Sequence, residues 1–131
     1  MSTSTNKTAA AMVAEAKQGI ENLTVEQVDS ELSSGQSVVV DLREPGECTE
    51  NGSIPGAVHA PRGMLEFYAD PTSPYHKAEL DPSRRTVLYC ASGGRSALAV
   101  TTLRELGYTN VAHLDGGIKA WVASGRTVAR E

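Results

Sequence analysis

Two kinds of hydrophobic pattern alternate along the 131-residue chain. Short, largely apolar runs that contain many β-branched residues predict strands covered on both faces. Apolar residues three or four positions apart predict helices between these strands. The strands are expected at residues 38–40, 57–60, 86–89 and 111–114, and the helices at residues 9–18, 64–69, 97–106 and 118–124 and between Thr24 and Gly35. This alternation predicts a three-layer α/β sandwich, with a central, mainly parallel sheet of about five strands and helices on both faces.

Polar residues and glycines mark the ends of the second helix. Thr24 and Gln27 have the spacing of a capping box, in which each side chain accepts a hydrogen bond from the backbone of the other residue. Gly35 then follows as a stop signal. Residues 1–20 are expected to form an N-terminal tail or helix, which leaves residues 21–131 as the folded domain.

The composition narrows the class of protein. The formal net charge is -4, whereas a nucleic-acid surface needs a clustered basic face. No apolar stretch approaches the roughly 20 residues that cross a bilayer. The first 19 residues lack the apolar region of a secretory signal. We therefore expect a soluble, cytoplasmic protein that binds neither nucleic acid nor membrane.

The two cysteines differ in their surroundings. Cys48 and Cys90 are too few for a disulfide framework and have no spacing to histidine that predicts zinc. Cys90 follows the predicted strand at residues 86–89, and the carboxyl ends of parallel strands are where ligands bind in open sheets. Two glycines, an arginine and a serine then precede a helix. A purely structural alternative is that Cys90 is a small buried residue before a glycine turn. We favour it less because a strand, a cysteine, two glycines, an arginine and a helix follow one another here.

The segment CASGGRS, residues 90–96, has the composition of an anion pocket. Amides of a tight loop and of a helix N-terminus favour negative charge, so we expect them to lower the pKa of Cys90. Arg95 adds a planar fork of donors that suits an oxyanion. Ser96 can cap the helix or donate its hydroxyl proton. The sequence thus predicts a nucleophilic Cys90 without a histidine base, and the predicted binding residues are Ala91, Ser92, Gly93, Gly94, Arg95 and Ser96.

Three further residues are candidates for a supporting role. Asp41 and Arg43 follow the strand at residues 38–40, at the same edge of the sheet as Cys90. They either pair with each other to fix the loops or contact the substrate directly. Arg62 either lends charge to the pocket mouth or is a solvated surface residue. The three histidines, His59, His76 and His113, are scattered along the chain. His59 and His113 fall in predicted strands and are expected to be core or surface residues rather than ligands.

Four motifs, in order along the chain, resemble the signatures of the rhodanese family. They are VVVDLREPGE at residues 38–47, NGSIPGAVHAP at residues 51–61, CASGGRS at residues 90–96 and LDGGIKAW at residues 114–121. The resemblance runs from about residue 23 to about residue 128. Ser53 stands where the family usually has histidine, a departure that we expect to be structural.

The resemblance implies a rhodanese-like fold and a single-domain thiosulfate sulfurtransferase. A sulfane sulfur would move from thiosulfate or a similar donor to cyanide or a thiol acceptor, through a persulfide on Cys90. No metal and no organic cofactor are implied. The partners would be a small sulfur donor and a nucleophilic acceptor, with a thiol protein as a further candidate acceptor. The natural donor and acceptor, the pathway, the oligomeric state and the participation of Cys48 are left open.

The length of the loop bears on two neighbouring activities. Four residues, 91–94, separate Cys90 from Arg95. Phosphatases of the same fold, and tyrosine phosphatases of a different fold, carry one more residue there, which makes room for phosphate. The shorter loop favours sulfur transfer over a cysteine-dependent phosphatase or arsenate reductase. A non-catalytic sulfur-carrier or binding module is a third alternative, and the presence of Cys90 and Arg95 speaks against a module that has lost its chemistry.

Overall fold

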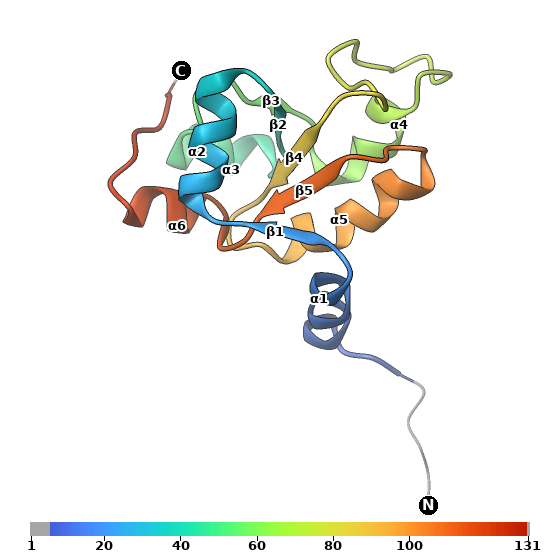
Figure 1. The fold of residues 1–131 in the computed structure, drawn as a ribbon, viewed down its shortest axis with the longest axis horizontal. Helices are drawn as coiled ribbons and strands as arrows, with labels where there is room; N and C mark the ends of the chain where they lie inside the picture. The colour runs from blue at the N-terminus through green and yellow to red at the C-terminus, as the bar shows by residue number, and fades with distance from the viewer. Residues whose placement is uncertain (1–5, 131) are drawn as a thin grey trace, which may run out of the picture.

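The computed structural model describes residues 6–130, so residues 1–5 and 131, including part of the predicted N-terminal tail, lie outside it. Strands and helices alternate along the chain (Figure 1). One sheet has the order β1-β5-β4-β2-β3, and all neighbouring strands in it are parallel. The strands are β1 (Glu21–Leu23), β2 (Val38–Asp41), β3 (Val58–His59), β4 (Thr86–Tyr89) and β5 (Val111–Leu114). The helices are α1 (Ala9–Gln18), α2 (Val25–Ser34), α3 (Pro45–Asn51), the 3-10 turn η1 (Arg62–Met64), α4 (Leu65–Ala69), α5 (Gly94–Glu105) and α6 (Gly117–Ala123).

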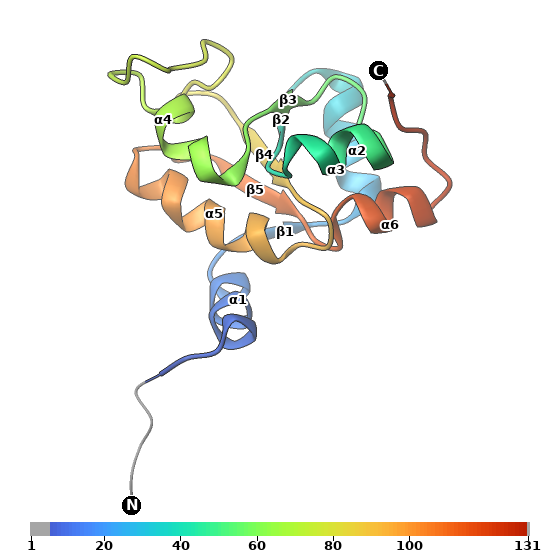
Figure 2. The ribbon, with the colours of Figure 1, turned by 180° about the vertical axis from the view of Figure 1, so that it is seen from behind.

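Helices cover both faces of the sheet, which confirms the predicted three-layer α/β fold. Successive side chains of a strand point to opposite faces, so each strand contributes to two hydrophobic clusters. Val39 and Val87 pack in the cluster that contains residues of α2 and α6. Val40 and Leu88 pack in the cluster that contains residues of α4 and α5. Figure 2 shows α5 lying along β4 and β5 on its side of the sheet.

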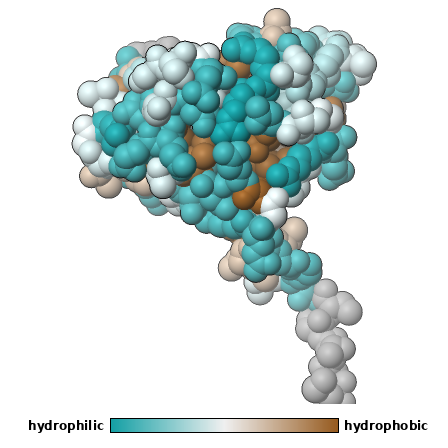
Figure 3. Space-filling view, viewed as in Figure 1, coloured by the Kyte–Doolittle hydropathy of each residue, from teal (hydrophilic) through white to brown (hydrophobic). Residues whose placement is uncertain are grey.

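The N-terminal helix is an addition to this sandwich. α1 begins after Thr8, whose side chain accepts a hydrogen bond from Ala11, and it ends at Gly19 as predicted. It packs on α5, and Figure 1 shows it standing out from the sheet. On the face seen in Figure 3, hydrophobic residues form only small areas within a mostly hydrophilic surface. Among residues 6–130, no helix is both long and apolar enough to cross a bilayer.

Several boundaries agree with the predictions. The strands expected at residues 38–40, 86–89 and 111–114 are β2, β4 and β5, and that expected at residues 57–60 is the two-residue β3. The capping box of Thr24 and Gln27 is present, and Gly35 ends α2 in the left-handed conformation, with φ of 73°. The helices expected to begin at residues 97 and 118 begin earlier, at Gly94 and Gly117.

Three elements were not predicted: β1, α3 and the 3-10 turn η1, which precedes the helix expected at residues 64–69. β1 has only three residues, of which Leu23 alone is buried, so it carries no hydrophobic period. α3 carries no period either, but its start has a sequence signal: Pro45 occupies the first turn, and Glu44 and Glu47 form a capping box. α3 matters for the site because it places Glu47 opposite the Cys90 loop.

Candidate active site

Cys90 lies immediately after β4 and before the first turn of α5, at the carboxyl edge of the sheet. The residue is only 1% exposed. Its Sγ accepts hydrogen bonds from the backbone amides of Gly93 at 3.2 Å and Ser96 at 3.4 Å. Gly93 makes this loop possible because its φ is 108°, a conformation that side chains disfavour. The structure therefore places the thiol inside a cradle of amides at the start of a helix.

The cradle changes the acidity of the thiol. Burial alone would raise the pKa of Cys90, because the thiolate would lose its hydration. Hydrogen bonds from the Ser96 hydroxyl and from the amides of Ser96, Gly93 and Ser92 outweigh burial, and the pKa is lowered below the ordinary value. The thiolate is the nucleophilic form of cysteine, so the loop favours the reactive species.

Ser96 connects Cys90 to a histidine. Its Oγ lies 3.6 Å from Sγ of Cys90 and 2.8 Å from Nδ1 of His113, whose Nε2 lies 2.7 Å from Oδ1 of Asn22. Of the two roles predicted for Ser96, that of helix cap is wrong, because Gly93 occupies the cap position and Ser96 lies within the first turn, whereas the hydroxyl does form hydrogen bonds. Burial lowers the pKa of His113 to about 4, so the ring is neutral near pH 7. The contact between His113 and the Cys90 loop was not predicted.

The protons of this chain can be assigned. Nδ2 of Asn22 donates to the carbonyls of Lys17 and Ile20, which turns Oδ1 toward His113. Nε2 of His113 must then carry the proton and donate it, which leaves Nδ1 as an acceptor for the Ser96 hydroxyl. One hydroxyl has one proton, so Ser96 donates to one of three acceptors at a time: Nδ1 of His113 at 2.8 Å, the carbonyl of Gly93 at 3.4 Å or the Cys90 thiolate at 3.6 Å. The two amides are the donors that the thiolate always keeps.

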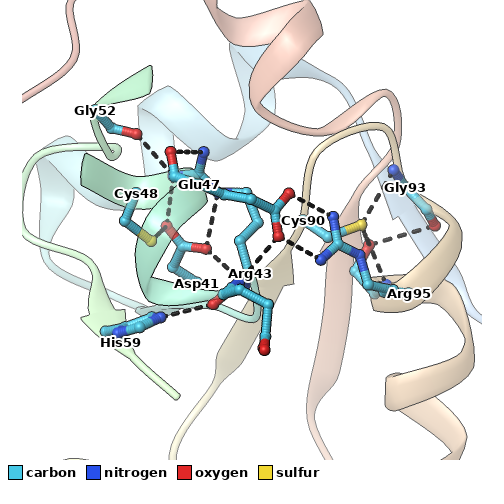
Figure 4. Close-up of polar contacts among 11 residues, drawn as sticks. Asp41, Arg43, Glu47, Cys48, Gly52, His59, Cys90, Gly93 and Arg95 are labelled. Carbon is cyan, nitrogen blue, oxygen red and sulfur yellow. Dashed lines mark hydrogen bonds and ion pairs between the residues drawn. The ribbon is translucent and has the colours of Figure 1, made fainter. Parts of the chain in front are cut away.

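Arg95 is held across the pocket by a carboxylate. Its Nη1 and Nη2 donate to Oε1 and Oε2 of Glu47 at 2.8 and 2.9 Å, the parallel geometry drawn in Figure 4. The Arg95 hydrogen bonds lower the pKa of Glu47 to about 2, so the carboxylate is charged at neutral pH. The ion pair joins the first turn of α5 to α3.

Asp41 and Arg43 form a second ion pair, which is buried. The side chains are 2% and 1% exposed, and Nη2 of Arg43 lies 2.8 Å from Oδ2 of Asp41. Arg43 also donates to the carbonyl of Gly52 at 2.7 Å, and Asp41 accepts from the Tyr89 hydroxyl at 2.6 Å (Figure 4 draws the first of these contacts). Burial opposes charge on Asp41, but the Arg43 and Tyr89 hydrogen bonds outweigh it and lower the pKa. The pair ties β2 to β4 and to the end of α3, which is the geometry of a positioning role.

Arg62 lies on a different part of the surface. It is half-buried and pairs with Glu66 at 3.0 Å and with the hydroxyl of Thr102 at 3.3 Å. These contacts join η1 to α4 and α5. These partners lie outside the loop that holds Cys90. The position of Arg62 therefore does not support the suggestion that its charge contributes to the mouth of the pocket.

The DGG turn of the fourth motif packs on the back of the loop. Amides of Ile118 and Lys119 donate to the carbonyls of Cys90 and Ala91 at 3.0 and 3.1 Å. Gly117 has a φ of 62°, and a Cβ built there would lie 2.5 Å from the carbonyl oxygen of Ala91. Only glycine fits this approach, so the turn supports the shape of the loop.

Cys48 has a separate environment. Its Sγ lies 3.5 Å from Oδ2 of Asp41, and burial and that carboxylate raise the pKa of its thiol. It lines a cavity of about 300 Å³ with Ser53 and His59, away from the amides that hold Cys90. Among residues 6–130, no three His, Cys, Asp or Glu residues are grouped as a metal site would need.

Comparisons with known proteins agree with this geometry. The profile of the Rhodanese-like domain family matches residues 24–124. A mouse "Thiosulfate sulfurtransferase/rhodanese-like domain-containing protein 3" is 30% identical over 105 residues, which cover 76% of this chain and 67% of that protein. The Mycobacterium tuberculosis "Probable adenylyltransferase/sulfurtransferase MoeZ" is 33% identical over 100 residues, which cover 76% of this chain and 24% of that protein. The chain therefore spans about a quarter of the longer relative.

Solved structures share the fold. A Rhodopseudomonas palustris protein of unknown function, described as a possible tyrosine phosphatase, is 40% identical and superposes with a TM-score of 0.89 over 98% of this chain and 99% of its own. The thiosulfate sulfurtransferase of Pseudomonas aeruginosa is 27% identical and has a TM-score of 0.74 over 93% of this chain and 22% of its own. The family profile covers most of the chain, and the parallel sheet is that of its structural neighbours. The chain therefore belongs to the rhodanese-like domain family.

Proposed function

We propose that the protein is a sulfurtransferase of the thiosulfate sulfurtransferase type, with Cys90 as its nucleophile. It would move a sulfane sulfur from a donor such as thiosulfate to cyanide or a thiol. The observation that supports this proposal most is the buried Sγ of Cys90, which accepts hydrogen bonds from the amides of Gly93 and Ser96. Such a cradle stabilises a sulfur anion without needing a neighbouring base.

The reaction would have two displacements. In the first, the Cys90 thiolate attacks the outer sulfur of thiosulfate, a sulfur–sulfur bond forms, and the donor sulfur–sulfur bond breaks with sulfite as the leaving group. In the second, cyanide or a thiolate attacks the outer sulfur of the Cys90 persulfide, and the Cys90 thiolate is released. The covalent intermediate predicts ping-pong kinetics. The amides of Gly93 and Ser96 hold the anion in both half-reactions.

The residues of the loop and its surroundings would have different roles in the reaction. The amides from Ser92 to Ser96 would bind the charge on sulfur, and the glycines allow the close approach of backbone to ligand. Arg95 would orient an anionic donor when it is released from Glu47. Asp41 and Arg43 would fix the neighbouring strand ends rather than touch the substrate.

The test of this function is turnover by the parent and by Cys90→Ser, measured as thiocyanate formed from thiosulfate and cyanide. We expect turnover in the parent and none in the variant, while circular dichroism shows the same fold in both. Ser replaces a buried sulfur with an oxygen of similar position, so the amide cradle stays filled. Retained thiocyanate formation in Cys90→Ser would remove the proposed nucleophile.

A phosphatase or arsenate reductase is the second candidate, because one structural neighbour is described as a possible tyrosine phosphatase. Both reactions use a cysteine and an arginine in an anion loop. The four residues between Cys90 and Arg95 favour the sulfur chemistry. Hydrolysis of a phosphoester that is lost in Cys90→Ser would favour this candidate over sulfur transfer.

A further inference from the structure

His113 is a buried, titratable side chain that the proposed reaction does not use. Its Nδ1 lies 2.8 Å from Oγ of Ser96, the residue whose backbone amide donates to Sγ of Cys90 at 3.4 Å. A polar side chain that is buried this deeply needs a partner for each ring nitrogen. Ser96 and Asn22 are these partners, so a single hydroxyl group joins the histidine to the Cys90 loop.

His113 and Cys90 compete for the proton of the Ser96 hydroxyl. The contact with Nδ1 of His113 is the shortest that the hydroxyl makes, and it is the strongest while Cys90 carries no charge. A thiolate accepts a charge-assisted hydrogen bond, which is about twice as strong as a neutral one, so it offsets the longer distance to Sγ. The hydroxyl can move between the two acceptors by rotating about its Cβ–Oγ bond, and no bond has to break.

The two half-reactions place opposite demands on the sulfur of Cys90. In the first, this sulfur is the attacking thiolate, and a thiolate of lower pKa is the weaker nucleophile. In the second, it is the leaving group, and a thiolate of lower pKa leaves faster. A donor fixed on Sγ would help the second step and slow the first. A hydroxyl that is shared with another acceptor stabilises the thiolate only in part, which serves both steps.

We propose that His113 is a positioning residue for sulfur transfer, which accepts the Ser96 hydroxyl and thereby limits how far that hydroxyl stabilises the Cys90 thiolate. This inference rests on the sulfur transfer proposed above and goes beyond it, because it assigns a role to a side chain that acts only through Ser96. The amides of Gly93 and Ser96 stay on Sγ throughout (Figure 4 draws the first of these contacts). The Ser96 hydroxyl is the donor that changes its acceptor.

The charge of His113 does not change in this role. Burial lowers the pKa of its ring to about 4, so the ring stays neutral over the range in which Cys90 ionises. The charged groups that act on the ring are Asp115, which favours the imidazolium, and Lys17, which disfavours it, and the two pair with each other at 2.8 Å. Arg95 is the cation that interacts with the Cys90 thiolate, and it keeps its charge over the same range.

The experiment compares His113→Leu and His113→Gln with the parent by the pH dependence of iodoacetamide alkylation at Cys90, read from peptide masses. Leu has about the volume of histidine and no acceptor, so Ser96 can donate to the thiolate without competition. The pH of half-maximal alkylation should fall by about one unit, the effect of one stronger charge-assisted hydrogen bond. The amide oxygen of Gln can still accept the hydroxyl, so His113→Gln should keep the profile of the parent.

A double-mutant cycle with Ser96→Ala tests whether the effect passes through the hydroxyl. Ser96→Ala removes a donor to the thiolate and should raise the pH of half-maximal alkylation. When His113→Leu is added to Ser96→Ala, the profile should not change further, because no hydroxyl is left to share.

Asn22→Ala is a milder variant, since Asn22 is exposed. Without the Asn22 acceptor, the ring of His113 can carry its proton on Nδ1 and donate it to Ser96. The Ser96 proton is then free for Cys90. The pH of half-maximal alkylation should therefore fall, by less than in His113→Leu.

The two half-reactions give a second measurement. At a pH at which Cys90 is fully ionised, His113→Leu should take sulfur from thiosulfate about threefold more slowly than the parent, because nucleophilicity falls with thiol pKa with a slope of about 0.4–0.5. Discharge of the loaded persulfide by cyanide should be faster than in the parent, because the Cys90 thiolate is then the better leaving group. A purely structural defect would slow both steps.

The outcomes separate this inference from the function on which it rests. An unchanged alkylation profile in His113→Leu would overturn the inference, and so would an equal shift in His113→Gln or a shift that persists without the Ser96 hydroxyl. If His113→Leu does not fold, Asn22→Ala decides in its place, and an unchanged profile there has the same meaning. Alkylation needs no sulfur transfer. If the parent takes no sulfur while the profiles shift as expected, the proposed function fails and the effect of His113 on the thiolate stands.

Discussion

Nδ1 of His113 lies 2.8 Å from Oγ of Ser96, a buried contact between β5 and the first turn of α5. Oγ of Ser96 also lies 3.6 Å from Sγ of Cys90. Ser96 therefore lies between the neutral imidazole and the sulfur and contacts both. The ring is fixed from its other side by Asn22 of β1. Thus β1, an edge strand, helps to position the Cys90 loop, which follows the central strand β4.

The stability of the protein should depend on pH through His113. Its pKa is lowered by burial to about 4, whereas the unfolded value is about 6.5. The unfolded chain therefore binds a proton first as the pH falls, and stability is lost between about pH 6.5 and about pH 4. The shift corresponds to about 3 kcal/mol of unfolding free energy. Urea unfolding across this range measures it.

The reference for that measurement is His113→Gln, which removes the titrating ring and leaves an amide to contact Ser96. Its unfolding free energy should fall less than that of the parent between the same pH limits. Equal slopes in the two proteins would show that His113 does not carry the pH dependence.

The buried ion pair predicts a large stability effect. Arg43→Met leaves the Asp41 carboxylate buried without its main partner, and the expected loss is about 3–5 kcal/mol of unfolding free energy. The matched control is Arg62→Met, which breaks the half-exposed pair with Glu66 and should lose at most about 1 kcal/mol. Urea unfolding of both variants compares them. A loss of similar size at the two positions would contradict the role given to Arg43.

Gly117 should be needed for the shape of the Cys90 loop. Gly117→Ala places a Cβ 2.5 Å from the Ala91 carbonyl, so the loop must shift and sulfur transfer should fall by at least about tenfold. Gly107→Ala is the control because φ there is 95° and nothing lies within 4 Å of its Cβ. That variant carries backbone strain without the clash. Steady-state rates that fall equally in both variants would count against a specific role of Gly117.

The thiol of Cys90 should react as a thiolate below the range of a free cysteine. Burial opposes ionisation, but the Ser96 hydroxyl and the loop amides lower the pKa. The rate of iodoacetamide alkylation should therefore reach half its maximum below about pH 8.5, the ordinary value. Cys48, whose pKa is raised by burial and by Asp41, supplies the internal comparison when peptide masses are read. A half-maximum for Cys90 at or above that of Cys48 would oppose the amide cradle.

The sequence predicts the sheet better than it predicts the site contacts. The runs at residues 38–40 and 86–89 locate β2 and β4 because strands buried on both faces must be apolar throughout. The loop at Cys90 could be placed because glycines and a helix start have local signals. The pairing of Arg95 with Glu47 joins residues 48 positions apart, and no local pattern specifies such a contact.

The position of His113 near α5 could have been predicted from the alternation of side chains in β5, although this signal is weaker than a local motif. Val111 and His113 stand two residues apart in β5, so they share a face of the sheet. Val111 packs in the cluster that contains α5, and His113 consequently points toward the same helix. The alternation of strand side chains could therefore have placed the ring near α5. Its partner could not be chosen from the sequence, because the start of α5 was predicted three residues late.

The most direct test of the account is the intact mass of the protein after incubation with a sulfur donor, thiosulfate or N-acetylcysteine persulfide, beside Cys90→Ser. The account predicts a gain of one sulfur atom in the parent alone, and cyanide should remove it as thiocyanate. No gain with either donor, or an equal gain in Cys90→Ser, would contradict a persulfide on Cys90.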